Sequence, residues 1–201
     1  MQVVDGAVLS RTLIDLCMKD EELKSKKPLL VFPGEGARVV GKYLKKMKPK
    51  LTANNEVFLP TRRTMVKSGV FNLSVDYSSL PNTLDTNTVL IIDDVVATGQ
   101  TAEEVASTLK MRFPGIRCIL ASWLFVWPST NENKKSPSGV NGIDKIITSI
   151  ILKGNYTARP PINSISCFMR NEQRYRDVKK NFTDKYIGDK NAFQEIMEEL
   201  K

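Results

Sequence analysis

The chain has 201 residues and a formal net charge of +8, with 30 Lys and Arg residues against 22 Asp and Glu residues. That length fits one compact domain with a substantial core, and the charge is too small for a histone-like polycation. No apolar run approaches the roughly 18 residues that a membrane-spanning helix needs. The N-terminus lacks the basic-then-apolar order of a signal peptide. We therefore expect a cytoplasmic protein without a membrane partner.

The sequence contains no histidine. Its absence excludes Ser-His-Asp and Cys-His nucleophile systems, histidine-ligated zinc and histidine general bases. Cys17, Cys118 and Cys167 are odd in number and have no CxxC spacing, so we expect reduced thiols and neither a disulfide framework nor a thiolate metal site. Any chemistry must then use carboxylates, amines, guanidinium groups and backbone N–H groups.

The first half of the chain alternates between helix and strand patterns. Leucines at positions 9, 13 and 16 together with Cys17 predict an amphipathic helix. The apolar residues 29–32 predict a short buried strand that ends at Pro33 and Gly34. An apolar stripe over residues 39–47 predicts the next helix, and strands are expected around Val57 and Leu73.

The second half continues the alternation. An apolar strand over residues 88–94 ends in two acids, a helix is expected over 102–109 and a strand over 116–126. Residues 128–142 are rich in Pro, Ser, Asn and Gly and predict a loop. Apolar runs at 146–152 and 162–169 and a final helix around 193–200 follow.

This order predicts an α/β protein with a mostly parallel central sheet flanked by helices. We expect a single domain over residues 1–201, with a core of about 22–127. A small hood would comprise about 128–201 together with the N-terminal helix. Ligands of such sheets bind at the carboxyl ends of the strands.

The positive charge concentrates between residues 24 and 67, where twelve basic residues stand against two acids. A basic segment of this kind attracts polyanions. Most of its lysines are expected on a solvated helix face. Arg62, Arg63 and Lys67 differ because they follow a strand end near the expected ligand edge, and we expect them to contact phosphate.

Residues 89–102 read VLIIDDVVATGQTA. The apolar strand delivers Asp93 and Asp94 to the carboxyl edge of the sheet, where two carboxylates can accept hydrogen bonds from vicinal sugar hydroxyls. The helix that follows offers free N–H groups to a phosphate, and a glycine lets the backbone approach it closely. The turn between strand and helix consists of Ala97, Thr98, Gly99, Gln100 and Thr101. Together these residues predict a sugar-phosphate site.

This stretch resembles the phosphoribosyl pyrophosphate (PRPP) motif of the type I phosphoribosyltransferases, in which a hydrophobic strand, two acids and a Thr-Gly-x-Thr turn follow one another. The resemblance extends over about residues 29–126. It implies that the basic residue delivered to the pyrophosphate is Arg62 or Arg63. It also implies a pyrophosphate-binding loop made of Pro33, Gly34, Glu35 and Gly36.

Two features depart from the family pattern. Glu35 places a negative charge in the implied pyrophosphate loop, where the family commonly has a neutral or basic residue. The segment over residues 65–88 is short for the family's mobile catalytic loop.

The resemblance implies an enzyme that moves the phosphoribosyl group of Mg²⁺–PRPP to a nucleobase, a purine or an orotate-like base, and releases pyrophosphate. Asp93 and Asp94 would hold the ribose hydroxyls as the catalytic pair, and residues 97–101 would hold the 5′-phosphate. Mg²⁺ would be held mainly by PRPP, near the two acids, without a dedicated protein site. Arg62, Arg63 or Lys67 would neutralise the pyrophosphate. The resemblance also implies a homodimer.

Two other functions remain open. One is a PRPP-binding regulator without catalysis, with nucleic acid as a partner, for which Glu35 and the basic segment speak. The other is a P-loop NTPase, because residues 36–42 fit GxxxxGK and LIIDD could serve as its acidic strand. Against the NTPase, Tyr43 occupies the position where a Ser or Thr must ligate Mg²⁺.

Overall fold

The computed structural model describes residues 6–25, 27–48, 55–67, 70–96, 98–128 and 140–154. The helices and strands of these segments are, in chain order, α1 (Gly6–Lys19), α2 (Glu21–Ser25), β1 (Leu29–Pro33), α3 (Gly34–Met47), β2 (Glu56–Leu59), β3 (Thr61–Lys67), β4 (Val70–Val75), β5 (Thr88–Val96), α5 (Gln100–Arg112), β6 (Arg117–Pro128) and β7 (Lys145–Gly154). None of the helices in these segments has the length and apolar composition to cross a lipid bilayer.

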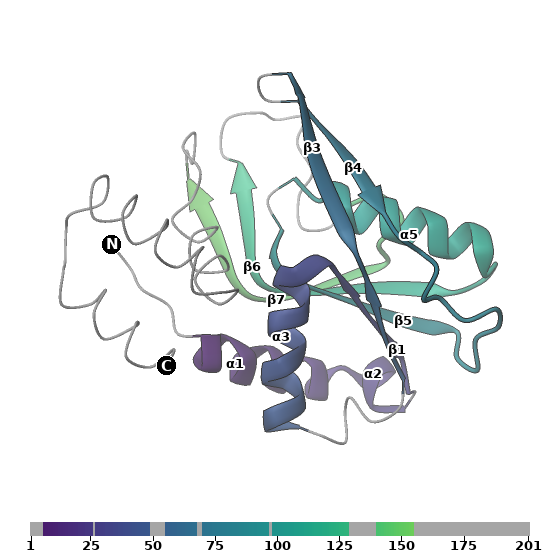
Figure 1. Cartoon of the computed structure of the whole chain (residues 1–201). Helices are drawn as coiled ribbons and strands as arrows, with labels where there is room; N and C mark the ends of the chain where they lie inside the picture. Colours follow the sequence, from purple (N-terminus) through teal and green to yellow (C-terminus); the bar gives the residue numbers. More distant parts are fainter. Residues whose placement is uncertain are drawn as a thin grey trace.

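Five of the strands form one parallel sheet in the order β2-β1-β5-β6-β7. The other two, β3 and β4, pair antiparallel as a separate hairpin that stands out from the body of the protein (Figure 1). The predicted α/β fold with a mostly parallel central sheet flanked by helices is thus confirmed.

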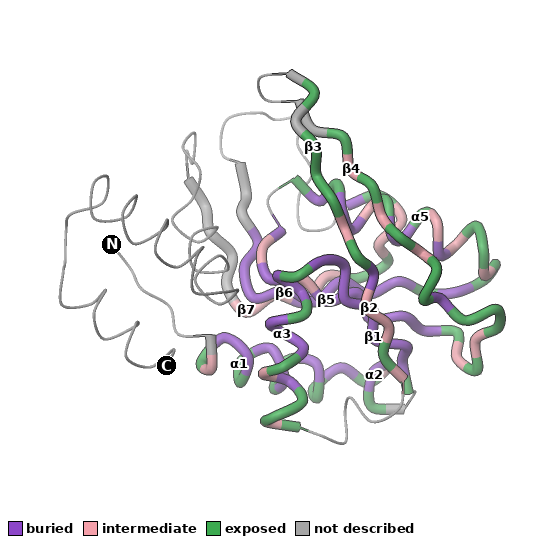
Figure 2. The backbone as a smooth tube through the Cα atoms, in the orientation of Figure 1, coloured by how far each residue is buried: buried purple, intermediate pink, exposed green. Residues whose placement is uncertain are grey.

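The central strands are apolar on both faces because helices cover both sides of the sheet. On one face, side chains such as Leu30 and Leu90 pack with α1 and α3. On the other face, Val31 and Ile91 pack with α5. Burial therefore concentrates in the sheet and the inner sides of the helices, whereas the β3–β4 hairpin is largely exposed (Figure 2).

The chain reverses its direction of travel across the sheet between β1 and β5. From β1 it passes through α3 to β2 on one side, and from β5 through α5 to β6 on the other. Open parallel sheets bind ligands at the carboxyl ends of the strands that flank such a switch point. Here those ends are Pro33 of β1 and Val96 of β5.

The sequence analysis assigned the N-terminal helix to the hood. In the structure this helix, α1, packs in the core of the protein. Its residues Leu9 and Leu13 are buried in the same cluster as α3. The indole Nε1 of Trp123 in β6 donates a hydrogen bond to the Ser10 hydroxyl at 3.0 Å. The Ser149 hydroxyl of β7 donates to the Leu9 carbonyl at 2.8 Å. These contacts fix α1 against the carboxyl-terminal strands of the sheet.

Strand β7 also lies beyond the expected core boundary near residue 127, yet it pairs with β6 along most of its length. The apolar run at 146–152 therefore completes the main sheet, and the boundary drawn from the sequence is wrong for this element. The rest of the expected hood, with the apolar run at 162–169 and the final helix, lies outside the described residues.

Two strand boundaries differ from the predictions. The strand expected around Val57 ends at Leu59, so that β2 joins the sheet and β3 begins the hairpin after Pro60. Proline cannot donate to a ladder, which favours a break there. As a result Arg62 and Arg63 follow the end of β2 but lie within the next strand, β3. Strand β5 also continues past Asp94 to Val96, because its last two residues are apolar and pair with β6.

Cys17 and Cys118 are free, buried thiols, in agreement with the prediction. Burial raises the pKa of Cys17 to about 12 and that of Cys118 to about 11. Both groups are therefore protonated and unreactive near neutral pH. Cys167 lies outside the described residues.

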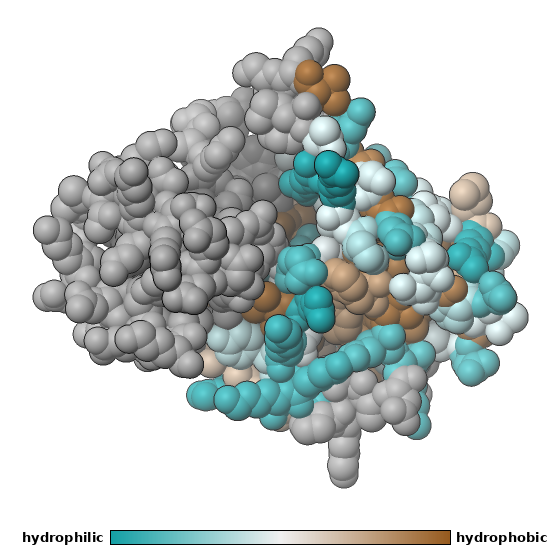
Figure 3. All heavy atoms as spheres, in the orientation of Figure 1, coloured by the Kyte–Doolittle hydropathy of each residue, from teal (hydrophilic) through white to brown (hydrophobic). Residues whose placement is uncertain are grey.

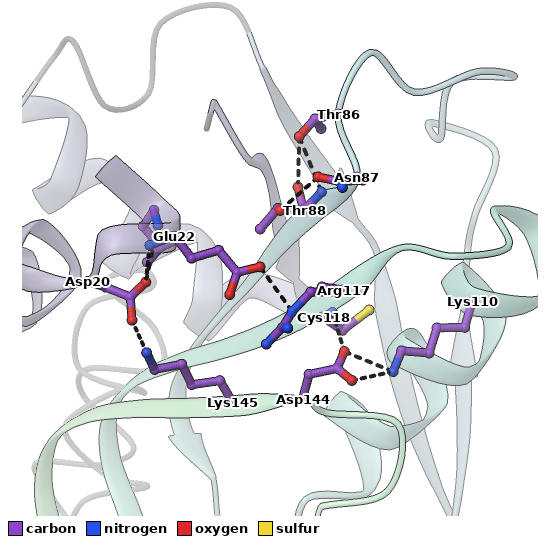
Figure 4. Close-up of polar contacts among 11 residues, drawn as sticks. Asp20, Glu22, Thr86, Asn87, Thr88, Lys110, Arg117, Cys118, Asp144 and Lys145 are labelled. Carbon is purple, nitrogen blue, oxygen red and sulfur yellow. Dashed lines mark hydrogen bonds and ion pairs between the residues drawn. The ribbon is translucent and has the colours of Figure 1, made fainter. Parts of the chain in front are cut away.

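Ion pairs join the helices to the sheet at the amino ends of the parallel strands (Figure 4). Asp20 caps α2, since its Oδ1 accepts hydrogen bonds from the N–H groups of Glu22 and Leu23, both at 3.1 Å. The other carboxylate oxygen of Asp20 pairs with Lys145 of β7. Glu22 pairs with Arg117 of β6 at 2.9 Å. The short helix α2 is thereby fastened to two strands.

Asp144 forms the corresponding link on the other face. Its carboxylate lies 2.8 Å from the Lys110 ammonium of α5 and accepts a hydrogen bond from the Cys118 N–H at 2.7 Å. Desolvation raises the pKa of this carboxyl, but the hydrogen bonds from Lys110 and Cys118 outweigh it, and the net pKa lies below the usual value. Asp20 follows the same pattern, with Lys145 and the α2 N–H groups lowering its pKa against desolvation.

We expect Asp20→Ala to reduce the free energy of unfolding at pH 7 by about 0.5–2 kcal/mol, the usual effect of losing a helix cap. Because the folded-state pKa of Asp20 is below its unfolded value near 3.8, this stabilisation is present above that value and is lost as pH falls through the folded-state pKa. Denaturant unfolding at pH 7 and about pH 2 measures both effects.

Glu21→Ala is the matched control, since the Glu21 side chain is 86% exposed and pairs only with nearby Lys24 among the contacts described. It should change the free energy of unfolding by less than about 0.5 kcal/mol. An Asp20→Ala loss that is the same at both pH values would contradict the role given to the carboxylate.

Candidate functional site

Strand β1 passes directly into α3 without a loop. Pro33 is the last residue of the strand and the N-cap of the helix, and Gly34 is its first residue. Gly34 has a φ of +82°, a left-handed conformation that glycine adopts without strain and that turns the chain within one residue. The predicted loop over residues 33–36 is therefore a strand–helix junction. The N–H groups of its first helical turn have no partner within the helix and face the carboxyl edge of the sheet.

The carboxylate of Asp94 lies against this first turn of α3. A Cβ atom on Gly36 would be 2.3 Å from its Oδ2 and 2.4 Å from its Cγ, much closer than non-bonded atoms approach. The residue at 36 must therefore be glycine for the carboxylate to lie there. Asp94 is buried, with 9% of its surface exposed. Its negative charge stands at the positive end of the helix dipole, which favours it.

Strand β3 reaches the same junction. A Cβ atom on Gly34 would be 2.3 Å from the Thr61 hydroxyl oxygen, so Thr61 covers the start of α3. Side chains alternate along a strand, so Arg63 faces the same side as Thr61 and Arg62 faces the other. Of the two arginines expected to bind phosphate, the structure therefore turns Arg63 toward the site.

Arg63 contacts the first turn of α5. Its Nη2 donates a hydrogen bond to the hydroxyl of Thr101 at 2.7 Å. Thr101 is buried, with 7% of its surface exposed. The contact joins the hairpin to the helix that follows the two acids, across 38 residues of sequence.

The turn into α5 is built around Gly99. This residue is buried, has a φ of +77° and is the N-cap of the helix, without a side-chain cap. Thr98 and Gln100 on either side of it are exposed, and the Thr98 hydroxyl accepts a hydrogen bond from the Gln100 N–H at 3.4 Å. Ala97 lies outside the described residues. The part of the turn that is described is a tight connection between β5 and α5.

Residues 140–144 run alongside α5 and were expected only as part of a loop and the start of the next section. Val140 is buried and covers Gly99, where an added Cβ atom would be 3.2 Å from the valine Cγ1. The Asn141 N–H donates to the Glu103 carboxylate at 3.0 Å. This segment contacts α5 and its N-cap at positions three or four residues apart, which lie on one face of the helix. These positions are Gly99, Glu103, Ala106 and Lys110. We call residues 140–144 the strap.

Val140 is a site residue that the sequence did not identify. In the sequence, Val140 is a single apolar residue at the end of a polar stretch. Such a pattern is equally typical of a buried residue and of an exposed loop residue. Its partner Gly99 is 41 positions earlier in the chain, so no local pattern joins the two.

Asp93 resists ionisation in this site. Desolvation raises its pKa well above the usual value, and the neighbouring Asp94 carboxylate raises it further. The Asp94 N–H, which donates to Asp93 Oδ1 at 2.9 Å, and the Arg63 guanidinium act in the opposite direction but do not compensate. A buried acid with a raised pKa next to a second acidic side chain is typical of functional sites.

Not every predicted residue converges on this site. Glu35 is exposed in the first turn of α3 and pairs with Arg38 at 3.5 Å, with about half of each side chain exposed. Arg62 is exposed on the opposite side of β3 from Arg63. Lys67 ends β3, four residues beyond Arg63, and its side chain lies outside the described part of the structure.

The NTPase hypothesis is wrong, because the GxxxxGK stretch at 36–42 lies inside α3. A P-loop wraps phosphate with a glycine-rich loop that precedes its helix. Here Gly41 instead packs on Phe32, whose Cε1 would be 2.8 Å from a Cβ atom at that position. Because Gly41 has no side chain, α3 can pack closely against Phe32 of β1.

Figure 3 shows the surface of the protein in the same orientation as Figure 1. Hydrophilic residues cover much of the hairpin and the helices below it, with hydrophobic residues between them over the edge strand β2. The Arg38 guanidinium lies 5.2 Å from the centre of the Phe58 ring of β2. Lys45 of α3 pairs with Glu56 of the same strand. Part of the basic face of α3 is thus used to hold the edge of the sheet.

Asp93 and Asp94 are the acids of the site that could lie near a metal ion. Within the described segments, no group of three or more Asp, Glu, Cys or His side chains could hold a metal ion. Mg²⁺ commonly binds one or two protein carboxylates and completes its coordination with substrate phosphates and water. Asp93 and Asp94 fit that mode of binding, and they do not form a cage of protein ligands.

No family model matches the chain, and a search of curated proteins also finds no match. Similar solved structures include the xanthine-guanine-hypoxanthine phosphoribosyltransferase of Helicobacter pylori, with 14% identity, 73% of this chain and 86% of that chain covered, and a TM-score of 0.48. A purine phosphoribosyltransferase from Pyrococcus horikoshii has 18% identity, coverage of 70% and 82%, and a TM-score of 0.46.

The orotate phosphoribosyltransferase of Aeropyrum pernix has 15% identity, coverage of 74% of this chain and 73% of that chain, and a TM-score of 0.43. At these identities and TM-scores, likeness to the three structures assigns neither an activity nor a substrate to this chain.

We expect Asp93→Asn to raise the melting temperature at pH 7. The folded-state pKa of Asp93 lies above its unfolded-state pKa, so the free energy of unfolding falls as pH rises from the lower value to the higher one. Asparagine does not ionise, so the variant avoids this loss of stability. The gain should shrink as pH falls below the unfolded-state pKa near 3.8. Thermal unfolding across this pH range measures it, with the exposed Asp85→Asn as the control. A variant less stable than wild type at pH 7 would contradict the desolvation of Asp93.

We expect Gly36→Ala to destabilise the protein by about 1–3 kcal/mol, as overpacking does, because the new Cβ atom displaces the Asp94 carboxylate. Without that contact, alanine in a helix is more stable than glycine by up to about 1 kcal/mol. In an Asp94→Ala background the same change should therefore be neutral or stabilising. Denaturant unfolding of the four proteins gives the coupling, and simple additivity of the two changes would contradict the contact.

Proposed function

We propose that this protein is a PRPP-dependent phosphoribosyltransferase that transfers a phosphoribosyl group to a nucleobase, a purine or an orotate-like base, with release of pyrophosphate. The observation that carries the proposal is the meeting of three groups at the switch point of the sheet. These are the Asp93–Asp94 pair, the start of α3 and the start of α5. The sequence resemblance to the PRPP motif supplies the identity of the substrate.

The site and PRPP have complementary charge patterns. PRPP carries a phosphate at one end of its ribose, a pyrophosphate at the other and two vicinal hydroxyls between them. Each helix start offers N–H groups and a positive dipole end to an anion, and the carboxylates between them can accept hydrogen bonds from hydroxyls. In this proposal the Thr98–Thr101 turn holds the 5′-phosphate, Asp93 and Asp94 hold the diol, and residues 34–36 hold the pyrophosphate.

The reaction needs little covalent help from the protein. The bond between the anomeric carbon and the pyrophosphate oxygen breaks, and pyrophosphate keeps the electron pair. A base nitrogen forms the new bond to that carbon, and the proton of that nitrogen passes to water. Positive charge develops on the ribose, next to the two carboxylates. The protein contributes positioning and electrostatic stabilisation, for which histidine is not required.

Magnesium is the cofactor of this proposal, and it would be held mainly by the phosphates of PRPP, near Asp93 and Asp94. When bound, it would neutralise charge on the departing pyrophosphate. Homodimeric assembly, a cytoplasmic location and a hood that encloses the base are further parts of the proposal, carried by the family resemblance.

A regulator that binds PRPP without turning it over is the second candidate. The exposed Glu35 and the buried Asp94 both place negative charge at the first turn of α3. These charges oppose a free pyrophosphate and so disfavour efficient departure of the leaving group. Nucleic acid would be the partner of such a regulator.

Calorimetry with Mg²⁺–PRPP and a pyrophosphate-release assay test the two functions. We expect binding, and turnover with at least one base among adenine, guanine, hypoxanthine, xanthine, uracil and orotate. Asp94→Asn should weaken PRPP binding by about 1.5–3 kcal/mol, one charge-assisted hydrogen bond, or about 10- to 150-fold. Asp85→Asn changes an exposed acid that precedes β5, and it should leave PRPP binding unchanged.

The outcomes separate the candidates. Binding without turnover on any base would favour the regulator, and a steep salt dependence of RNA or DNA affinity would strengthen that case. A wild-type protein that does not bind Mg²⁺–PRPP would refute both functions.

A further inference from the structure

Strand β3 crosses the site from the start of one helix to the start of the other. Thr61 lies against Gly34 at the start of α3, and Arg63 donates to Thr101 in the first turn of α5 at 2.7 Å. Residues two apart on a strand face the same side and are separated by about 7 Å. The same face of β3 thus serves both helix starts, with Thr61 at the α3 end and Arg63 at the α5 end.

The α5 end needs a positive charge if a phosphate is to bind there. The first turn of the helix already carries one acid, Glu103. A phosphate monoester carries up to two negative charges. Among the residues that the structure describes, Arg63 is the basic side chain in contact with this turn. Its guanidinium supplies the charge that the helix dipole alone does not balance.

The chemistry of the Arg63 contact also suits a phosphate. A guanidinium has five N–H donors in a planar fork that matches two oxygens of one phosphate. The bond to Thr101 uses one of them. A phosphate seated at the α5 turn would accept from the remaining donors and from the Thr101 hydroxyl at once.

We propose that Arg63 is a ligand of the 5′-phosphate and not of the pyrophosphate. The assignment rests on the proposed function and differs from the sequence expectation, which gave Arg62 or Arg63 to the pyrophosphate. The Arg63 guanidinium donates directly to the Thr101 hydroxyl. With substrate bound, the phosphate lies between the hairpin and α5 and is held by both, so the β3–β4 hairpin is tied to the sugar phosphate through one side chain.

Calorimetry with two separate probes, ribose 5-phosphate and Mg²⁺–pyrophosphate, tests the assignment. We expect Arg63→Ala to weaken ribose 5-phosphate binding at least about tenfold and to change pyrophosphate binding less than about twofold. Arg63→Lys keeps the charge but not the fork, and it should fall between wild type and alanine. Arg62→Ala, the adjacent residue on the opposite face, should leave ribose 5-phosphate binding as in wild type.

Other outcomes would overturn the assignment. Arg63→Ala that weakens pyrophosphate and spares ribose 5-phosphate would place the guanidinium at the α3 end. An equal loss in Arg62→Ala and Arg63→Ala would show a general effect of charge. Both results leave the proposed function intact, provided that the wild type binds Mg²⁺–PRPP. If it does not, the proposed function fails first. Thermal unfolding of each variant verifies that it is folded.

Discussion

The contact between the Asp94 carboxylate and Gly36 is the constraint on which the site depends. It requires glycine at position 36, a strand that enters its helix without a loop, and a neighbouring strand that carries the acid to the same edge of the sheet. A carboxylate at a helix start is favoured by the dipole. A second acid next to it is unfavourable. Burial and the Asp94 carboxylate together raise the pKa of Asp93 above that of an ordinary aspartate.

The two edges of the sheet have opposite roles. At the amino edge, Asp20 and Asp144 are matched by lysines and N–H groups, and both carboxyls ionise more readily than usual. At the carboxyl edge, burial and the neighbouring Asp94 carboxylate raise the pKa of Asp93. The first arrangement stabilises the fold, and the second places two acidic side chains next to each other at the candidate site. Ionisable groups with perturbed pKa values are typical of binding and catalytic sites.

The sequence predicts most of the fold because the apolar runs of β1, β5 and β6 and the stripes of α1, α3 and α5 are local patterns. It also identifies Asp93 and Asp94, since the motif is continuous. It does not separate Arg62 from Arg63, because their faces follow from where β3 begins after Pro60. The sequence also does not predict that Val140 packs on Gly99, or that β7 pairs with β6 in the main sheet. Those contacts join distant positions, and only the packed structure determines them.

The strap has a consequence for how the chain can vary. Since residues 140–144 are fixed to α5 from Gly99 to Lys110, insertions placed just before Val140 would leave those contacts in place. A deletion that removed Val140 would uncover the glycine turn while leaving the two acids intact. Tolerance to changes of length should therefore end abruptly at this valine, and homologous chains of different size should differ on its N-terminal side.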